Sequence, residues 1–409
     1  NLGSILIDMG RLKEAEISIR KAIRINPNLA IAYANLGTIL RDLDKLKEAE
    51  ISTRKAIALN PNLAITHSNL GSILIDMGRL KEAEISIRKA IRINPNLANA
   101  HLNLGSILID LGKLTELIDL SQSTLESKSI HEEKKLGALL HITIASLLQK
   151  DFSRTLLSIN QINELKNKVI INNLKNEDAR RHISTFSRFI TSLYPQLEKK
   201  KDNHISEKLP HFGESHCLSF AHQNLYIDSR YQTIQPVLIT GAKAWHFANK
   251  INNRWKDSLT QQIKNHTYND QVFISFGEID CRKDEGILPY TINKDKDMSE
   301  VCDKTIQGFL DHMELKLSPH YSKRYYFGIP APTRTKELPD ELDKKRIEII
   351  KIYNSIFKKA VLSRGSYFLD IYELTSNKNG ENNNIYMCDN THLSPKCLSI
   401  LFENFLYKS

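Results

Sequence analysis

A repeat with a period of 34 residues fills the N-terminal part of the chain and constrains its fold more than any other feature. The tripeptide Asn-Leu-Gly begins at positions 1, 35, 69 and 103, and residues 1–30 are identical to residues 69–98. A fixed period of this length is typical of stacked helix–turn–helix units, each of which buries its apolar face against its neighbours. The sequence therefore predicts a helical solenoid over residues 1–120.

Small and apolar residues within each unit occupy the positions where two antiparallel helices would touch. In the first unit they are Leu2, Gly3 and Leu6 in one helix and Ala15, Ile19 and Ala22 in the other. The pattern resembles the tetratricopeptide repeat, although Ile19, Thr53 or Ile87 replaces the usual aromatic residue of the second helix. The resemblance implies an interaction module that binds a protein or peptide on its concave face.

The repeat signature is lost between residues 121 and 204. Helical periodicity continues over 136–148 and 183–193, and residues 198–208 are polar. We predict that residues 121–204 form degenerate or capping helices followed by a linker.

Beyond residue 205, short apolar runs alternate with longer amphipathic stretches. The apolar runs are 209–212, 236–240, 272–276, 324–327 and 367–370, and the predicted helices are 215–225, 243–264, 298–317, 340–362 and 394–407. This alternation predicts a doubly wound α/β domain with a parallel sheet over residues 205–409. Functional residues of such sheets lie beyond the carboxyl ends of the strands.

Reactive residues stand at those positions. Those that follow a predicted strand are Ser215, Gly241, Asp280 and Arg282, while Asp389 and His392 stand shortly before the last predicted helix. A serine hydroxyl becomes a nucleophile when a neutral imidazole takes its proton, and a carboxylate can orient that imidazole. We interpret Ser215 as the nucleophile, His392 as the base and Asp389 as the orienting acid. The alternative is that each motif only caps a helix.

Two motifs in residues 205–409 resemble those of the SGNH, or GDSL-like, ester hydrolases. Gly213-Glu214-Ser215-His216 is similar to the first block of that family, with glutamate in place of aspartate, and residues 389–394 are similar to its last block, Asp-x-x-His. The resemblance implies a three-layer α/β/α, flavodoxin-like fold and a serine nucleophile acting on an ester. Its form is similar to the SGNH domains of polysaccharide O-acyltransferases, which implies an acylated carbohydrate or small molecule as substrate.

The oxyanion hole is where the chain departs from this family. The resemblance implies that the amides of Ser215 and Gly241 contribute donors, together with an asparagine in the third block. Here the third block contains Asp280 and Arg282 and no asparagine. Arg282 could supply the donor while Asp280 or Glu278 holds it, Asp280 could be protonated, or the hole is incomplete and activity is lost or changed.

Composition narrows the choice of partners and cofactors. The net charge is +10, but no block of five basic residues occurs, so we do not expect nucleic acid as a partner. No run of residues is apolar enough for a membrane span. The cysteines are Cys217, Cys281, Cys302, Cys388 and Cys397. Their odd number and the absence of zinc spacing favour reduced thiols in a cytoplasmic protein that has no metal or other cofactor.

Three functions remain open from the sequence. The first is an acyl or acetyl esterase joined to a tetratricopeptide interaction module. The second is an O-acyltransferase that shares the acyl-enzyme, because only the acceptor differs. The third is a scaffold that carries a non-catalytic SGNH-like domain. The chain also begins partway through a repeat, so we expect further residues to precede Asn1.

Overall fold

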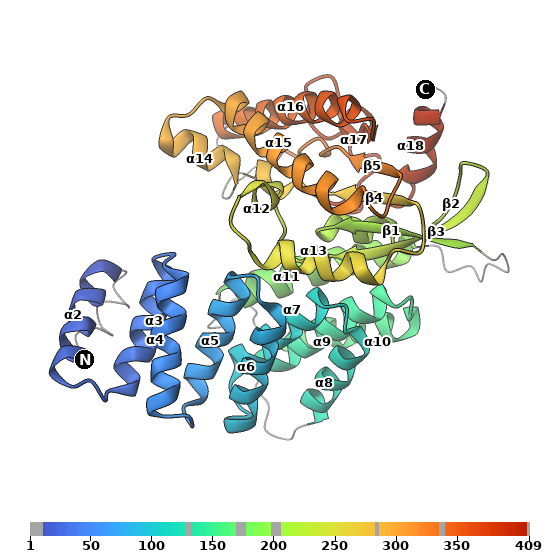
Figure 1. Cartoon of the computed structure of the whole chain (residues 1–409). Helices are drawn as coiled ribbons and strands as arrows, with labels where there is room; N and C mark the ends of the chain where they lie inside the picture. The colour runs from blue at the N-terminus through green and yellow to red at the C-terminus, as the bar shows by residue number, and fades with distance from the viewer. Residues whose placement is uncertain are drawn as a thin grey trace. The chain divides into compact units, whose positions relative to one another are not determined.

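The computed structural model describes residues 11–126, 132–168, 177–197, 206–282, 286–334 and 340–406. The chain divides into two compact units (Figure 1), one formed by Asn1–Leu111 with Ile251–Ser258 and the other by Gly112–Lys250 with Leu259–Ser409. The three segments predicted from the sequence are a finer division, and their boundaries stay predictions. Leu2, Gly3 and Leu6 lie outside the described residues.

The first unit is a series of antiparallel helices. They are α2 (Leu12–Ile25), α3 (Ala30–Asp42), α4 (Leu46–Leu59), α5 (Ala64–Asp76), α6 (Leu80–Ile93) and α7 (Ala98–Asp110). Ala15 and Ile19 are buried, as the repeat pattern predicts, and they pack with Leu36 and Ile39 of the next helix. Each helix thus buries its apolar stripe against its neighbours along the chain.

Glycine at the repeat position lets two helices of one unit approach closely. A Cβ atom on Gly71 in α5 would collide with the Ile87 side chain in α6, and one on Gly37 in α3 would collide with Thr53 in α4. Ile87 and Thr53 occupy the positions where the tetratricopeptide pattern usually has an aromatic residue. They are fully buried, so these smaller side chains fill the contact together with the glycine.

The second unit contains a six-stranded mixed sheet. Its strands are β1 (Glu207–Gly213), β2 (Asn224–Ile227), β3 (Arg230–Leu238), β4 (Gln271–Ser275), β5 (Lys323–Phe327) and β6 (Tyr367–Leu369). The order across the sheet is β2-β3-β1-β4-β5-β6. The pairs β3–β1, β1–β4, β4–β5 and β5–β6 are parallel, whereas β2 pairs antiparallel with β3.

Five strands match the predicted apolar runs, whereas β2 was missed. The sequence predicted a helix over 215–225, but the chain forms a short 3-10 helix at Ser215–Phe220 (η3) and then enters β2. β2 has only four residues, and two of them are exposed, so its apolar signal is weak. It turns back into β3 through Asp228 and Ser229, both with positive φ. The sheet is therefore mixed rather than purely parallel.

Helices lie on both faces of this sheet. The helices that follow α7 along the chain are α8 (Leu114–Glu126), α9 (Glu132–Leu148), α10 (Phe152–Lys168), α11 (Glu177–Leu193), α12 (Ala244–Ala248), α13 (Arg254–Asn265), α14 (Ile287–Lys294), α15 (Met298–Leu317), α16 (Asp340–Ser363), α17 (Ile371–Thr375) and α18 (Cys397–Leu406). Phe273 in β4 packs on Phe402 of α18, with ring centroids 5.5 Å apart. Tyr326 in β5 packs on Phe309 of α15 and Phe357 of α16, with centroids 6.3 and 5.9 Å away. Because successive side chains of a strand point to opposite faces of the sheet, each strand contributes side chains to the packing on both faces.

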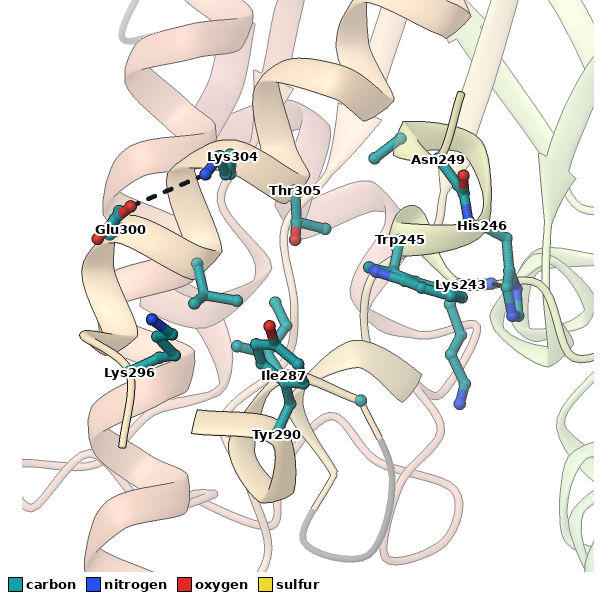
Figure 2. Close-up of a pocket in the computed structure, with 13 residues that line it drawn as sticks. Lys243, Trp245, His246, Asn249, Ile287, Tyr290, Lys296, Glu300, Lys304 and Thr305 are labelled. Atoms are coloured by element: carbon teal, nitrogen blue, oxygen red, sulfur yellow. Dashed lines mark hydrogen bonds and ion pairs between the residues drawn. The ribbon is translucent and has the colours of Figure 1, made fainter. Parts of the chain in front are cut away.

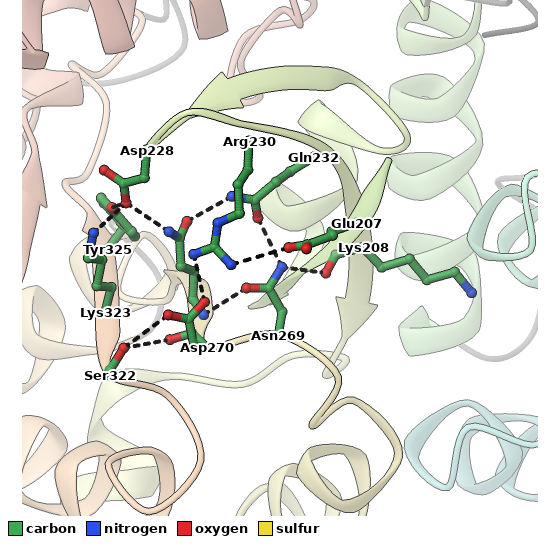
Figure 3. Close-up of polar contacts among 11 residues, drawn as sticks. Glu207, Lys208, Asp228, Arg230, Gln232, Asn269, Asp270, Ser322, Lys323 and Tyr325 are labelled. Carbon is green, nitrogen blue, oxygen red and sulfur yellow. Dashed lines mark hydrogen bonds and ion pairs between the residues drawn. The ribbon is translucent and has the colours of Figure 1, made fainter. Parts of the chain in front are cut away.

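A polar network holds the amino ends of the strands together (Figure 3). In the β2–β3 turn, the Asp228 carboxylate accepts hydrogen bonds from Lys323 Nζ (2.6 Å) and Gln271 Nε2 (2.7 Å). Arg230, at the start of β3, pairs with Asp270 just before β4, at 2.8 Å. The carboxyl ends of the strands, at the opposite edge, are left to the residues that follow them.

Replacement of Gly71 tests the close helix contact. Gly71→Leu should lower the free energy of unfolding by about 1–3 kcal/mol, because the added side chain cannot fit beside Ile87 without backbone movement. Ile65→Leu, at an exposed position of the same helix, should leave stability nearly unchanged. Urea denaturation of the full chain measures both variants, and equal stability of the two would contradict this packing.

Candidate functional site

Ser215 lies at the carboxyl end of the central strand β1. A Cβ atom on Gly213, the last residue of that strand, would collide with Ser275 of β4, so glycine is required there. The chain then turns into η3, whose N-cap Glu214 accepts a hydrogen bond from the backbone N–H of His216 at 3.1 Å. This turn leaves the Ser215 side chain partly exposed beside the sheet edge.

The three residues interpreted as nucleophile, base and acid lie together. Ser215 Oγ is 2.9 Å from His392 Nε2, and His392 Nδ1 is 2.9 Å from Asp389 Oδ2. Asp389 Oδ1 also accepts the backbone N–H groups of Thr391 (2.7 Å) and His392 (2.6 Å). The Asp-x-x-His spacing therefore closes a tight turn in which one carboxylate fixes both the backbone and the imidazole ring of His392.

His392 is buried and neutral. Its ring stacks on Phe189 of α11 with centroids 3.6 Å apart, and only 3% of the residue is exposed. Burial, together with the neighbouring charge of His216, lowers the pKa of His392 below its ordinary value, although the hydrogen bond to Asp389 opposes this. Nδ1 carries the proton that Asp389 accepts, so Nε2 presents a lone pair to Ser215.

The Ser215 hydroxyl has two acceptors for one proton. Glu214 Oε2 lies 2.8 Å from Ser215 Oγ, nearly the same distance as His392 Nε2. Burial would raise the pKa of Glu214, but the charge and hydrogen bond of His216, with the charge of Arg282 and the hydrogen bond from Ser215, together lower the pKa to about 2, so the carboxylate is ionised. The hydroxyl can give its one proton to Glu214 or to His392, and only the second arrangement suits a serine nucleophile.

His216 joins the two halves of this constellation. Its Nδ1 lies 2.6 Å from Glu214 Oε1, and its Nε2 lies 3.1 Å from the carbonyl oxygen of Thr391. Both partners only accept hydrogen bonds, so both ring nitrogens carry protons and the buried ring is an imidazolium. Burial would lower the pKa of His216, but the Glu214 carboxylate raises it to about 9. His216 is therefore a positioning residue that holds the Thr391–His392 turn against the end of β1.

Glu214, His216 and Glu278 form the group closest to a metal-ligand set among the described residues. One ligand atom from each lies within 4.8 Å of the others. Both nitrogens of His216 already donate hydrogen bonds, so neither offers a lone pair, and Glu278 pairs with Arg282 Nη2 at 2.6 Å. These residues do not fit a metal, because the imidazolium and the guanidinium already balance the two carboxylates.

The residues interpreted as the oxyanion hole do not all converge. Gly241 stands three residues after the end of β3 with φ of +67°, a conformation that glycine adopts at little cost. Asp280 is buried, and its two oxygens accept the backbone N–H groups of Ala244 (2.7 Å) and Trp245 (3.0 Å) at the start of α12. Asp280 therefore caps a helix here, and the structure does not bring its carboxyl to Ser215.

Arg282 likewise has a partner of its own. Its Nε donates to Glu278 Oε2 at 2.8 Å, and its Nη2 lies 2.6 Å from the same oxygen. Sequence reasoning considered Glu278 as a group that holds Arg282, but it missed Glu214 and His216 as partners of the serine and of the Thr391–His392 turn. The signal was present in Glu-Ser-His, because acidic and basic residues flank the nucleophile.

Comparison with known proteins identifies the first part of the chain. A tetratricopeptide repeat model matches residues 1–29, 30–63 and 65–97. The N-terminal region consists of tetratricopeptide repeats. No curated protein matches the chain. Among the described residues, no helix combines the length and apolarity needed to cross a bilayer.

Several solved structures are similar to part of the chain. MamA from Desulfovibrio magneticus is 18% identical, with a TM-score of 0.36, over 41% of this chain and 93% of that one. YrrB, described as a tetratricopeptide repeat protein with an unusual peptide-binding site, is 18% identical, with a TM-score of 0.35, over 45% and 89%. PilF of Pseudomonas aeruginosa is 20% identical, with a TM-score of 0.36, over 48% and 90%.

His216→Gln should change how stability depends on pH. The pKa of His216 in the folded chain, about 9, exceeds its ordinary 6.5, so protonated His216 stabilises the fold. That contribution is complete below pH 6.5 and is lost as the pH rises through 9. The free energy of unfolding should fall over this window in the unmodified chain and much less in the variant. Urea denaturation tests this, with the exposed His320→Gln as control, and an equal slope in all three proteins would refute the imidazolium.

Arg282→Ala distinguishes an oxyanion donor from a residue that holds the loop. Because the guanidinium is engaged with Glu278, we expect turnover of a neutral aryl acetate to slow by less than about tenfold, whereas loss of one oxyanion donor costs about 10²–10³-fold. Arg282→Ala and Glu278→Ala should lower the free energy of unfolding by similar amounts, since both break the same ion pair. If Arg282→Ala alone slowed turnover by about 100-fold or more, Arg282 would instead be the third donor.

Proposed function

We propose that residues 205–409 form a serine ester hydrolase of the SGNH kind, which removes an acyl group, such as acetyl, from a carbohydrate. The observation that carries this proposal is the continuous hydrogen-bonded series from Ser215 Oγ through His392 to Asp389, with both distances to the ring at 2.9 Å. The order of the five mutually parallel strands, 2-1-3-4-5 along the chain, also suits a flavodoxin-like fold.

The reaction follows from the protonation states of these groups. Ser215 Oγ attacks the ester carbonyl carbon while its proton passes to His392 Nε2, and Asp389 stabilises the imidazolium that forms. The tetrahedral intermediate collapses, the sugar hydroxyl leaves with the proton from His392, and an acyl-serine remains. Water, deprotonated by His392, then releases the acid. If a second sugar hydroxyl replaces this water, the same groups perform an acyl transfer.

Two backbone amides support the charge of the intermediate in this proposal. Among the described residues, neither the Ser215 nor the Gly241 N–H donates a hydrogen bond, so both can serve an oxyanion. Since Asp280 caps α12, the asparagine of the family has no replacement in that position. We infer an oxyanion hole built from these two backbone N–H groups. If two donors do not suffice, the alternative is a non-catalytic scaffold.

The repeats supply the second part of the proposal. Tetratricopeptide solenoids bind proteins or peptides, and we infer that this one brings the hydrolase to a protein partner. The identity of that partner does not follow from the residues.

Covalent labelling tests the nucleophile directly. A fluorophosphonate probe should modify the full chain at Ser215, identified by peptide mapping, and Ser215→Ala should abolish the modification. His392→Asn should slow labelling by at least about 10³-fold, because removal of the base costs most of the activation of the serine. Equal labelling after Ser215→Ala would mean that another residue is the nucleophile, and a chain that is never labelled would leave the scaffold as the function.

The pH dependence of labelling tests the base. The pKa of His392 lies below its ordinary value of 6.5, so the ring stays neutral and able to accept a proton at pH 6.5. Labelling should therefore remain fast down to pH 6.5 and decline only at lower pH. A decline centred above pH 6.5 would contradict the buried, neutral histidine.

A further inference from the structure

Phe189 of α11 covers one face of the His392 ring. The two rings stack with their centroids 3.6 Å apart and an angle of 15° between their planes. Phe189 is fully buried and only 3% of His392 is exposed, so bulk water does not reach the space between the rings. The imidazole that serves as base in the proposed reaction therefore has a buried aromatic ring against its face.

α11 lies in the chain before residue 205, outside the segment that contains the SGNH-like motifs. A second contact holds it near the base. Gln196, in the 3-10 turn that follows α11, accepts a hydrogen bond from Ser394 Oγ at 2.6 Å. Ser394 is two residues after His392, and both segments belong to the same compact unit. The position of Phe189 over the imidazole is thus fixed both by the stacked rings and by the link between Gln196 and Ser394.

The charge of His392 changes during the proposed reaction. The neutral ring accepts the Ser215 proton and becomes an imidazolium. Burial and the charge of His216 lower the pKa of His392, whereas the hydrogen bond to Asp389 and the charge of Glu214 raise it. The ring centroid of the His216 imidazolium is 4.9 Å from that of His392, so the two rings repel each other when the proton arrives. A group that favours positive charge on His392 would therefore speed the attack.

An aromatic ring is such a group. The face of a phenyl ring carries partial negative charge, and a cation over it is attracted, most strongly where water is excluded. The stacked geometry of Phe189 and His392 puts the developing imidazolium over that face. Arg188, the charged neighbour of Phe189 in α11, is exposed, so water and salt screen its charge. A leucine side chain would fill the same space without this attraction.

We propose that Phe189 is a positioning residue for the acyl transfer, whose ring face stabilises the imidazolium that His392 becomes when Ser215 attacks. The proton passes from Ser215 Oγ to His392 Nε2, and Phe189 exchanges no atom with either residue. The inference rests on the proposed function, because it needs that proton transfer. It also extends the active site beyond residues 205–409, since α11 becomes part of it.

The rate of fluorophosphonate labelling of the full chain, measured as a function of pH, tests this role. Phe189→Leu should slow labelling at neutral pH by about five- to thirtyfold, the effect of one desolvated cation–π contact. The midpoint of the pH profile should also move about one pH unit lower, because an imidazolium without the ring face is less stable and loses its proton more readily. Phe189→Tyr keeps the ring face and should restore both the rate and the midpoint.

A trifluorinated phenylalanine at position 189 separates charge from shape. Fluorine withdraws electrons from the ring face and changes the size of the ring little, so this variant should fold as the unmodified chain does. It should slow labelling and lower the midpoint as Phe189→Leu does, whereas a purely steric role predicts no change.

Two controls remove aromatic rings elsewhere. Phe357→Leu changes a similarly buried phenylalanine of α16, and it should lower the free energy of unfolding as Phe189→Leu does without slowing labelling. Tyr290→Leu removes a half-exposed ring from a pocket of about 710 Å³ between α12, α14 and α15, whose described lining residues do not include Ser215 or His392 (Figure 2). It should leave the rate unchanged, since loss of a ring matters only beside the base. Urea denaturation confirms that each variant is folded.

Four outcomes would overturn the inference. They are an unchanged rate in Phe189→Leu, an unchanged rate in the fluorinated chain, a slower rate with an unmoved midpoint, or an equal loss of rate in Phe357→Leu. Failure of the proposed function looks different, because the unmodified chain is then not labelled at Ser215. Failure of this inference leaves that labelling intact and independent of the ring at position 189.

Discussion

The ion pair between Glu214 and His216 is the interaction on which the candidate site depends. It joins segments that are 175 residues apart, because the same imidazolium that contacts Glu214 also donates to the Thr391 carbonyl. A buried charge pair is costly unless each charge is hydrogen-bonded. Here the turn after β1 supplies Glu214 and the turn before α18 supplies the Thr391 carbonyl, so the imidazolium has both of its acceptors only when both turns are in place. The geometry of Ser215 and His392 follows from that requirement.

Two further charges lie beside this pair. Glu278 and Arg282 lie on the loop after β4, where the Arg282 charge lowers the pKa of Glu214 and the Glu278 charge raises the pKa of His216. Two carboxylates and two cations thus balance one another at the carboxyl end of the sheet. This balance keeps Glu214 ionised next to the serine and leaves His392 as the neutral ring that can accept a proton. One loop therefore takes part in the site although its aspartate points to α12.

The sheet separates two sets of polar residues, one at each end of its parallel strands. At the amino ends, Asp228, Arg230 and Lys323 tie the strands together in pairs. At the carboxyl ends, Ser215 follows β1, and Glu278 and Arg282 follow β4. Such a division is general in doubly wound sheets, because parallel strands bring all their carboxyl ends to one edge.

The sequence by itself determined the repeats and five of the six strands. It also singled out Ser215, His392 and Asp389, which the fold brings together and whose catalytic roles stay a prediction. Repeats and buried strands are local patterns of apolar residues, and the Asp-x-x-His turn is set by spacing alone. The sequence did not predict β2, because a four-residue edge strand contains too few apolar residues to form a clear pattern. Only the tertiary structure decided the roles of Asp280, Arg282 and His216. Asp280 and His216 have partners distant in sequence, at the start of α12 and in the turn before α18. Arg282 pairs with Glu278 on its own loop. A charged side chain takes whichever partner the fold brings within reach.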